Sequence, residues 1–132
     1  MKHSKLEDCC LTIEQAKELQ ALGINMDNCL MEFCSLKDLG DYHLLPKHKY
    51  ENNFIRWKYI STLTNTEMLE MLPKEIDGYK LTFVYDYFRN GDDKYYIGYL
   101  KTYSAPLKEL ESTLLRNSLF GMIKWLKINK LM

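Results

Sequence analysis

Residues 79–104 decide the fold, and their sequence is YKLTFVYDYFRNGDDKYYIGYLKTYS. Two segments rich in aromatic and β-branched residues, 79–90 and 94–104, flank Gly91, and such residues favour β-strands. A glycine that follows Asn90 between two such segments is typical of a tight turn joining antiparallel strands. We therefore predict a tyrosine-rich β-hairpin over about 79–104.

The two faces of this hairpin follow from its turn. A two-residue turn at Asn90-Gly91 or Gly91-Asp92 pairs odd-numbered residues of the first strand with even-numbered residues of the second. One face is assigned to the core: Leu81, Phe83, Tyr85, Tyr96, Gly98 and Leu100. The opposite face is less polar than a solvated face should be. Its apolar residues are the candidate interaction surface: Val84, Phe88, Tyr95, Ile97 and Tyr99.

This candidate surface requires a cover, because a contiguous exposed patch of such side chains is unusual for a monomer. One cover would be the N-terminal strand region together with the loop around Phe54 and Trp57. The other would be a second molecule.

Two capping boxes mark helix starts outside the hairpin. The segments TIEQ at 12–15 and TNTE at 64–67 each place a hydroxyl at the helix start and a Gln or Glu three residues later. They predict an N-terminal helix over 12–22, ended by Gly23, and a short helix over 65–72.

The C-terminal segment carries two apolar stripes at helical spacing. One stripe lies within 107–114 and the other within 115–126, and the helical period turns them apart by about a third of a circle. A break at Arg116–Ser118 accounts for this change. We predict two helices, 107–115 and 118–129.

The part of the chain between the two capping boxes is less regular. Alternation over Cys29–Leu36 predicts a short strand, and Tyr42–Leu45 predicts a return strand that stops at Pro46. Residues 47–62 are interpreted as a long loop. The predicted fold class is therefore α+β, a small single domain over 1–132 in which helices pack an antiparallel sheet built around the hairpin.

Composition limits the classes of function. The chain has 132 residues, and 18 basic residues balance 18 acidic ones, so it lacks the positive field of a dedicated nucleic-acid-binding protein. Residues Met1–Asp8 lack the apolar stretch of a secretory signal, and no later segment has about 20 consecutive apolar residues. We expect no membrane association and a cytoplasmic location.

The residues that could carry chemistry are scattered. No phosphate-binding glycine loop and no G-x-S-x-G motif occurs. The cysteines Cys9, Cys10, Cys29 and Cys34 lack the usual spacing of a zinc site, so we interpret them as free, buried thiols and expect no metal or other cofactor. A metal-binding protein or Cys-dependent enzyme, with His43 or His48 completing the site, is the alternative.

Basic and aromatic residues are interleaved over 47–58, from Lys47 to Lys58. Such a mixture can bind single-stranded nucleic acid by charge and stacking. The competing interpretation is a surface loop whose aromatic residues hold it to the core, which makes nucleic acid an unlikely partner.

Four segments carry a resemblance: LTIEQAKEL at 11–19, LGI at 22–24, MLEMLPK at 68–74 and LFGMIKWL at 119–126. Their order resembles a family of small uncharacterised proteins carried by phages and mobile elements of gut bacteria. The resemblance covers about half of the chain, leaves 36–62 unmatched and supplies no active-site residues. It implies a compact α+β domain of phage or mobile-element origin.

Together these observations predict a non-enzymatic protein-interaction module. Two features support it: the absence of a catalytic motif and the apolar second face of the hairpin. Its partner is an unidentified protein or a second copy of the chain.

Overall fold

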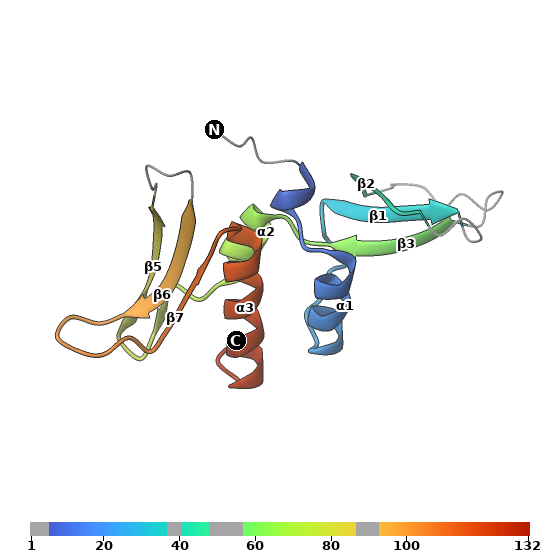
Figure 1. Ribbon diagram of the computed structural model, residues 1–132. Helices are drawn as coiled ribbons and strands as arrows, with labels where there is room; N and C mark the ends of the chain where they lie inside the picture. Colours follow the sequence, from blue (N-terminus) through green and yellow to red (C-terminus); the bar gives the residue numbers. More distant parts are fainter. Residues whose placement is uncertain (1–5, 37–40, 48–56, 87–92) are drawn as a thin grey trace.

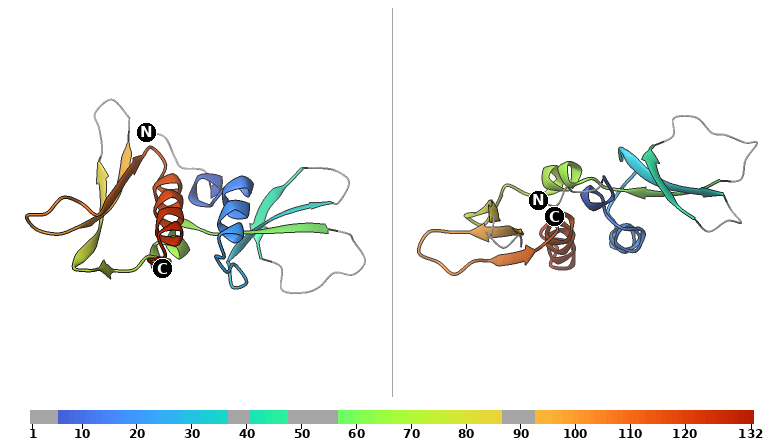
Figure 2. Two further views of the ribbon diagram at one scale, coloured as in Figure 1. Left: turned by 90° about the horizontal axis from the view of Figure 1, so that it is seen from below. Right: turned by 45° about the horizontal axis from the view of Figure 1, so that its top comes forward.

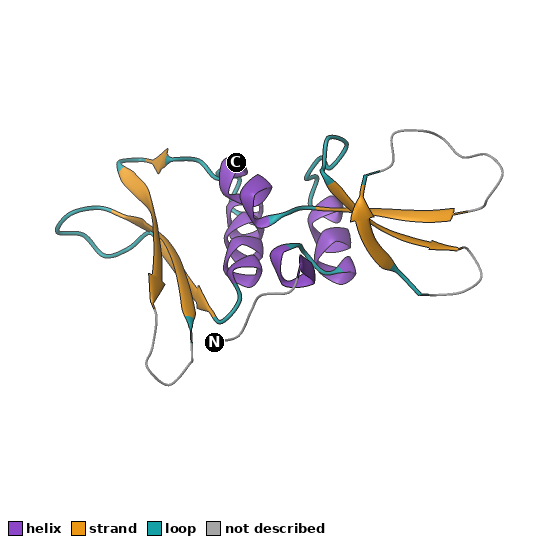
Figure 3. Cartoon of the chain, turned by 90° about the horizontal axis from the view of Figure 1, so that it is seen from above, coloured by secondary structure: helices purple, strands orange, loops and turns teal. Residues whose placement is uncertain are grey.

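The computed structural model of the protein describes residues 6–36, 41–47, 57–86 and 93–132. These residues form three α-helices and two antiparallel sheets, which confirms the α+β class. The helices lie between a three-stranded sheet at one end of the molecule and a four-stranded sheet at the other (Figures 1 and 3). The hairpin therefore belongs to one of two sheets rather than to a single central one.

The three-stranded sheet has the order β2 (His43–Pro46), β1 (Met31–Leu36) and β3 (Trp57–Thr62). The strands predicted near 29–36 and 42–45 both form. β3 corrects the interpretation of 47–62 as a loop, because it pairs with β1 along its whole length. The mixture of basic and aromatic residues in β3 obscures the alternation of apolar and polar residues that is typical of a strand. The strand is stabilised by its pairing with β1. The remaining residues of that interpreted loop, 48–56, lie outside the described part.

The four-stranded sheet has the order β4 (Glu75–Ile76), β5 (Tyr79–Asp86), β6 (Lys94–Leu100) and β7 (Lys108–Ser112). β5 and β6 form the predicted hairpin.

The predicted helix over 107–115 is wrong, because β7 occupies this segment as a strand. Leu110 pairs with Ile97 and is partly buried against the core, while Glu109 and Glu111 on either side are exposed. This alternation fits a strand, and pairing with β6 outweighs the helix propensity of Lys, Glu and Leu.

The two predicted capping boxes begin α1 (Ile13–Ala21) and α2 (Asn65–Met71). The Gln15 amide N–H donates to Thr12 Oγ1 at 3.2 Å, and the Thr12 amide N–H donates to Gln15 Oε1 at 3.0 Å. Thr64 and Glu67 make the same reciprocal pair at the start of α2. The last helix, α3 (Leu115–Ile128), begins at Leu115 rather than at the predicted residue 118.

The hydrophobic core forms where the helices meet the four-stranded sheet. α3 contributes its buried stripe of Leu119, Met122, Ile123 and Leu126, which follows the helical period. The other fully buried members come from the remaining elements: Leu11, Ala16, Leu19, Met68, Ile97 and Tyr99. One core cluster thus includes residues from both ends of the chain.

The N-terminal segment joins the two ends of the molecule. It begins with a 3-10 turn, η1 (Leu6–Cys9), and the Leu11 amide N–H then donates to the Leu63 carbonyl at 3.0 Å. The Thr62 hydroxyl donates back to the Leu11 carbonyl at 2.9 Å. On the other side, Arg116 Nη1 of α3 donates to the Glu7 carbonyl at 2.7 Å. The segment is therefore held from β3 and from α3 together.

Among the helices of the described residues, none is both long enough and apolar enough to cross a membrane.

Candidate functional site

The hairpin has a different register from the one its turn residues predicted. Lys80 pairs with Leu100, and Asp86 pairs with Lys94, so even-numbered residues face even-numbered ones. The predicted register paired odd-numbered residues of β5 with even-numbered residues of β6. It is wrong, and it differs from the observed register by an odd number of positions. A shift of that kind moves every side chain of one strand to the other face. The predicted turn residues Asn90 and Gly91 lie outside the described part.

The candidate interaction surface is corrected by this register. Ile97 and Tyr99 are 0% exposed in the core beneath α3, and Tyr95 on the same face is only partly exposed. Val84 lies on the opposite face and is exposed, and Phe88 is outside the described residues. The five predicted residues therefore do not form one exposed face, and α3 packs over the side of the sheet that holds Ile97 and Tyr99. Phe54 of the loop predicted to cover this face lies outside the described residues.

The exposed apolar residues of this sheet are on β5. α3 packs against β6 and β7, and Figure 1 shows β5 on the far side of the sheet from this helix. Phe83 is 43% exposed, Val84 39% and Tyr85 45%. Because consecutive residues of a strand point to opposite faces, these three expose apolar groups on both sides of β5.

The backbone of β5 also forms an edge of the sheet. β4 pairs with β5 only at Tyr79 and Lys80, and the Leu81 amide N–H donates to the Lys74 carbonyl on this side at 2.9 Å. Alternate residues of a strand direct their backbone groups to the same side, so Phe83 and Tyr85 direct theirs to the edge that Leu81 uses. No strand of the described residues pairs with this side beyond Lys80.

The opposite edge of the same sheet has a different composition. β7 carries Lys108, Glu109 and Glu111, and the Tyr96 hydroxyl donates to Glu109 at 2.6 Å while Lys94 forms an ion pair with Glu111 at 3.2 Å. Charged side chains on an edge strand discourage pairing with another chain. β5 lacks this protection between Leu81 and Tyr85.

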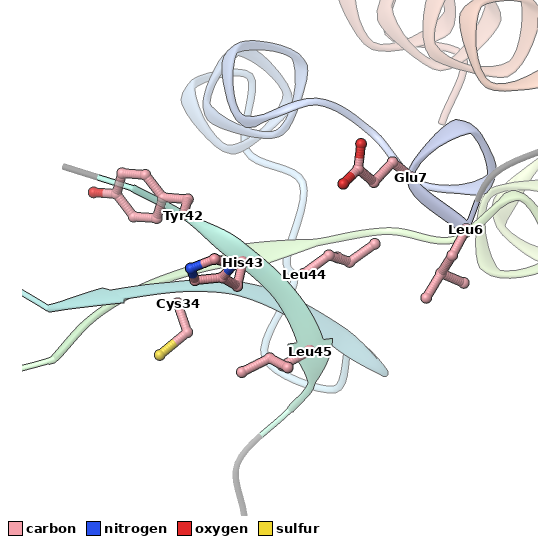
Figure 4. Close-up of a pocket in the computed structure, with 7 residues that line it drawn as sticks. All are labelled: Leu6, Glu7, Cys34, Tyr42, His43, Leu44 and Leu45. Atoms are coloured by element: carbon pink, nitrogen blue, oxygen red, sulfur yellow. The ribbon is translucent and has the colours of Figure 1, made fainter. Parts of the chain in front are cut away.

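A second candidate site is a pocket of about 540 Å³ in the other half of the molecule. Figure 4 shows that Leu6 and Glu7 of η1 form one side of it, and residues of β1 and β2 with Tyr42 form the other. Its lining also includes Cys34, His43, Leu44 and Leu45. Except for Cys34 and His43, the sequence interpretation missed these residues, because the contact between η1 and β2 has no local signal.

Cys34 and His43 are the two residues of this pocket that the metal-binding or Cys-dependent alternative names, and they lie opposite each other in the pairing of β1 with β2. Burial raises the pKa of the Cys34 thiol, and the nearby Glu32 raises it further. A cysteine nucleophile requires the opposite shift, because the thiolate is the reactive form. The raised pKa of Cys34 therefore opposes a role for this thiol as an activated nucleophile.

The other candidate ligands are not gathered at this pocket. Burial is the largest cause that raises the pKa of Cys10 to about 11, and the neighbouring Cys9 also raises it. The Cys29 thiol is buried and donates to the Met31 carbonyl at 3.2 Å. In the described part of the chain, no three His, Cys, Asp or Glu side chains come together as a metal would require. His48, the other histidine of the metal alternative, lies outside this part.

The predicted nucleic-acid segment 47–58 is described only at Lys47, Trp57 and Lys58. The ammonium group of Lys47 donates to the Asp27 carbonyl, and Lys58 belongs to β3. The interleaved basic and aromatic residues between them stay a sequence-based hypothesis.

Comparison with protein families, with curated proteins and with solved structures found no match for this chain. The resemblance to phage and mobile-element proteins therefore stays a prediction.

Proposed function

We propose that the protein is an interaction module that binds an extended segment of a partner protein as an additional strand beside β5. The observation that carries this proposal is the edge at Thr82–Asp86, where the strand exposes apolar side chains on both faces. Binding by strand addition depends on such an edge, because backbone hydrogen bonds supply affinity and alternate side chains supply specificity.

The chemistry of the edge defines the segment that would fit. Phe83 and Tyr85 lie on the face that holds α3, and the Tyr85 ring lies 4.9 Å from the Tyr95 ring. Val84 lies on the other face beside Tyr96. A bound strand would therefore place apolar side chains on both of its faces, because cross-strand neighbours pack side by side.

A non-enzymatic role is supported by the electrostatics of the second site. The raised pKa of Cys34 opposes nucleophilic chemistry in the pocket. An origin in a phage or mobile element is part of the proposal and rests on the four resembling sequence segments alone.

Peptide selection on the immobilised protein tests this function. We expect the selected peptides to alternate apolar residues and to shift the amide resonance of Phe83 in the NMR spectrum. Phe83→Pro removes the N–H that points to the edge and leaves the hydrogen bonds between β5 and β6 in place, so it should abolish peptide binding without unfolding the chain. The control is Glu14→Lys, a change at an exposed position in α1, outside the four-stranded sheet.

Two outcomes would contradict the proposal. One is the failure of any extended peptide to bind. The other is binding that persists in Phe83→Pro with chemical shift changes confined to the three-stranded sheet.

A further inference from the structure

We infer that the loop between β6 and β7 is a second interaction site, in which Tyr103 is the anchor that inserts its ring into an apolar pocket of another protein. The loop, residues 101–107, follows β6, whereas the edge described above belongs to β5. It lies at the opposite end of β6 from the pair formed by Asp86 and Lys94. The anchor is therefore separate from the β5 edge and does not depend on it.

Tyr103 exposes its whole side chain. Its exposed fraction is 104%, and the next most exposed large apolar side chain in the described part of the chain is Leu30, at 63%. Residues 101–106 are all exposed, and Leu107 after them is partly buried against the core. A tyrosine ring offers a large apolar area to a binding partner, and in this chain the ring of Tyr103 adds nothing to the core.

The backbone at Tyr103 is also in an unfavourable conformation. The Ser104 amide N–H donates to the Lys101 carbonyl at 3.2 Å and closes a four-residue turn. Tyr103 is the third residue of this turn and has a φ of 62°, whereas Thr102 before it has no positive φ. This pattern is that of a type II turn, whose third position favours glycine or asparagine. Tyrosine is strained there, because its Cβ crowds the backbone.

The other residues with a positive φ show that the strain at Tyr103 is unusual. Besides glycines, the described residues with a positive φ are Asp77, Tyr103 and Lys130. Asp77 begins the two-residue turn between β4 and β5, where aspartate before glycine is common. Lys130 follows the last residues of α3, where helices often take this conformation. Tyr103 has no comparable local reason, and a residue that breaks a local rule without a structural gain indicates a functional site.

The loop is held at its base, so the ring is presented in a defined place. The Leu107 amide N–H donates to the Tyr99 carbonyl at 3.0 Å. The Lys101 ammonium group lies 5.6 Å from the centre of the Tyr79 ring, and its side chain lies against Gly78. Figure 2 shows the loop projecting away from the helices. Binding through a positioned loop loses little conformational entropy, since the turn is already formed and tyrosine has few rotatable bonds.

The chemistry of the loop defines the pocket that would accept it. Apolar walls would contact both faces of the ring, and an acceptor at the end of the pocket would bind the phenol hydroxyl. Residues 94–108 contain three lysines and no acidic residue, so an acidic rim around the pocket would be complementary. Stacking on a nucleic-acid base is the competing mode, and the zero net charge of the chain opposes it.

Photo-cross-linking of the full chain tests whether Tyr103 enters a partner. The probe is p-benzoylphenylalanine, placed at position 103 and, as the matched control, at the adjacent exposed position 102. Each protein is irradiated in extracts of the cells that naturally make it. We expect a product with another protein whose yield is several times higher from position 103, and mass spectrometry of the cross-linked peptide should locate a concave surface of that protein.

Affinity measurements with the purified partner separate binding from folding. Tyr103→Asn should weaken binding roughly thirtyfold or more, the loss expected for an anchor residue, while the variant unfolds at a higher temperature because the strain is relieved. Tyr103→Phe keeps the ring and should lose less than about tenfold, the value of one hydrogen bond. Thr102→Asn should bind like the unmodified protein. Weaker binding by a more stable protein cannot result from unfolding.

Three results would overturn the inference. One is an equal yield of cross-linked product from positions 103 and 102, and another is a product formed only with nucleic acid or only with a second copy of the chain. The third is unchanged affinity of the purified partner for Tyr103→Asn. None of these results bears on the β5 edge, because peptide binding and Phe83→Pro test that site separately.

Discussion

The Tyr99 hydroxyl donates a hydrogen bond to the Pro73 carbonyl at 2.7 Å and connects the middle of the four-stranded sheet to the segment after α2. Tyr99 is fully buried, and burial raises its pKa to about 12 from an ordinary 10.0. The hydroxyl must remain protonated to donate this hydrogen bond, so the bond is lost when the pH rises above the pKa of Tyr99.

This relationship predicts a loss of stability at alkaline pH. Below pH 10 the folded and unfolded chains both keep the Tyr99 proton, so the contribution is fully present. Between pH 10 and about 12 the unfolded chain releases the proton first, and the free energy of unfolding falls as the pH rises. Urea unfolding across this range measures the slope.

The control for the alkaline prediction is Tyr99→Phe. It should cost about 1 kcal/mol at neutral pH, because it removes one hydrogen bond, and it should show a shallower slope above pH 10. Equal slopes in the two proteins would contradict the assignment to Tyr99.

The corrected register predicts the effect of a charge at Ile97. Ile97→Lys should destabilise the fold by about 4 kcal/mol or more, because it places an ammonium group in the core, and this is a large part of the total stability of a small domain. Val84→Lys on the neighbouring strand should stay folded, since Val84 is exposed. Circular dichroism of the two variants checks this. If both variants stay folded, the burial of Ile97 is contradicted, and the result favours the register predicted from the turn, in which Val84 and Ile97 share one face.

The capping boxes predict that two substitutions, one in each box, lower the stability of the fold by similar amounts. Thr12→Ala and Thr64→Ala should each destabilise the fold by about 1 kcal/mol, because each leaves a helix amide without its acceptor. Thr66→Ala, an exposed threonine in the same first turn of α2, is the control and should be nearly neutral. Thermal melts that do not distinguish the three variants would show that the caps contribute nothing.

Tyr103 predicts a gain of stability on substitution. It is fully exposed in the loop between β6 and β7, which projects away from the helices (Figure 2), and its φ is 62°. A residue other than glycine or asparagine is strained by roughly 1 kcal/mol in this left-handed region. Tyr103→Asn should therefore raise the melting temperature, whereas Thr102→Asn beside it should not. A lower melting temperature for Tyr103→Asn would mean that the tyrosine ring makes a stabilising contact.

Features set by neighbouring residues could be predicted from the sequence. The starts of α1 and α2 depend on Thr12 and Thr64 and on side chains three residues away, so the capping boxes located them. The hairpin was also predictable, because β-branched and aromatic residues dominate both of its strands.

Features set by distant residues could not be predicted. Asp86 pairs with Lys94 rather than across a two-residue turn at Gly91, and this register sends Ile97 into the core. Only the contact with α3, which comes later in the chain, identifies the buried face. The edge at Phe83 was missed for the same reason, although three consecutive apolar residues that cannot all point inward were a signal for it.

The hydrogen bond from Arg116 to the Glu7 carbonyl joins residues 109 positions apart, and that from Gln15 to Asn117 spans 102 positions. During synthesis on a ribosome, η1 and α1 are made before β3 and α3, the two elements whose groups hold them. The N-terminal segment can therefore contact β3 before α3 has been made, and its contacts with α3 form later. Contacts of such high sequence separation slow folding, since the entropy of closing long loops is lost before the contacts form.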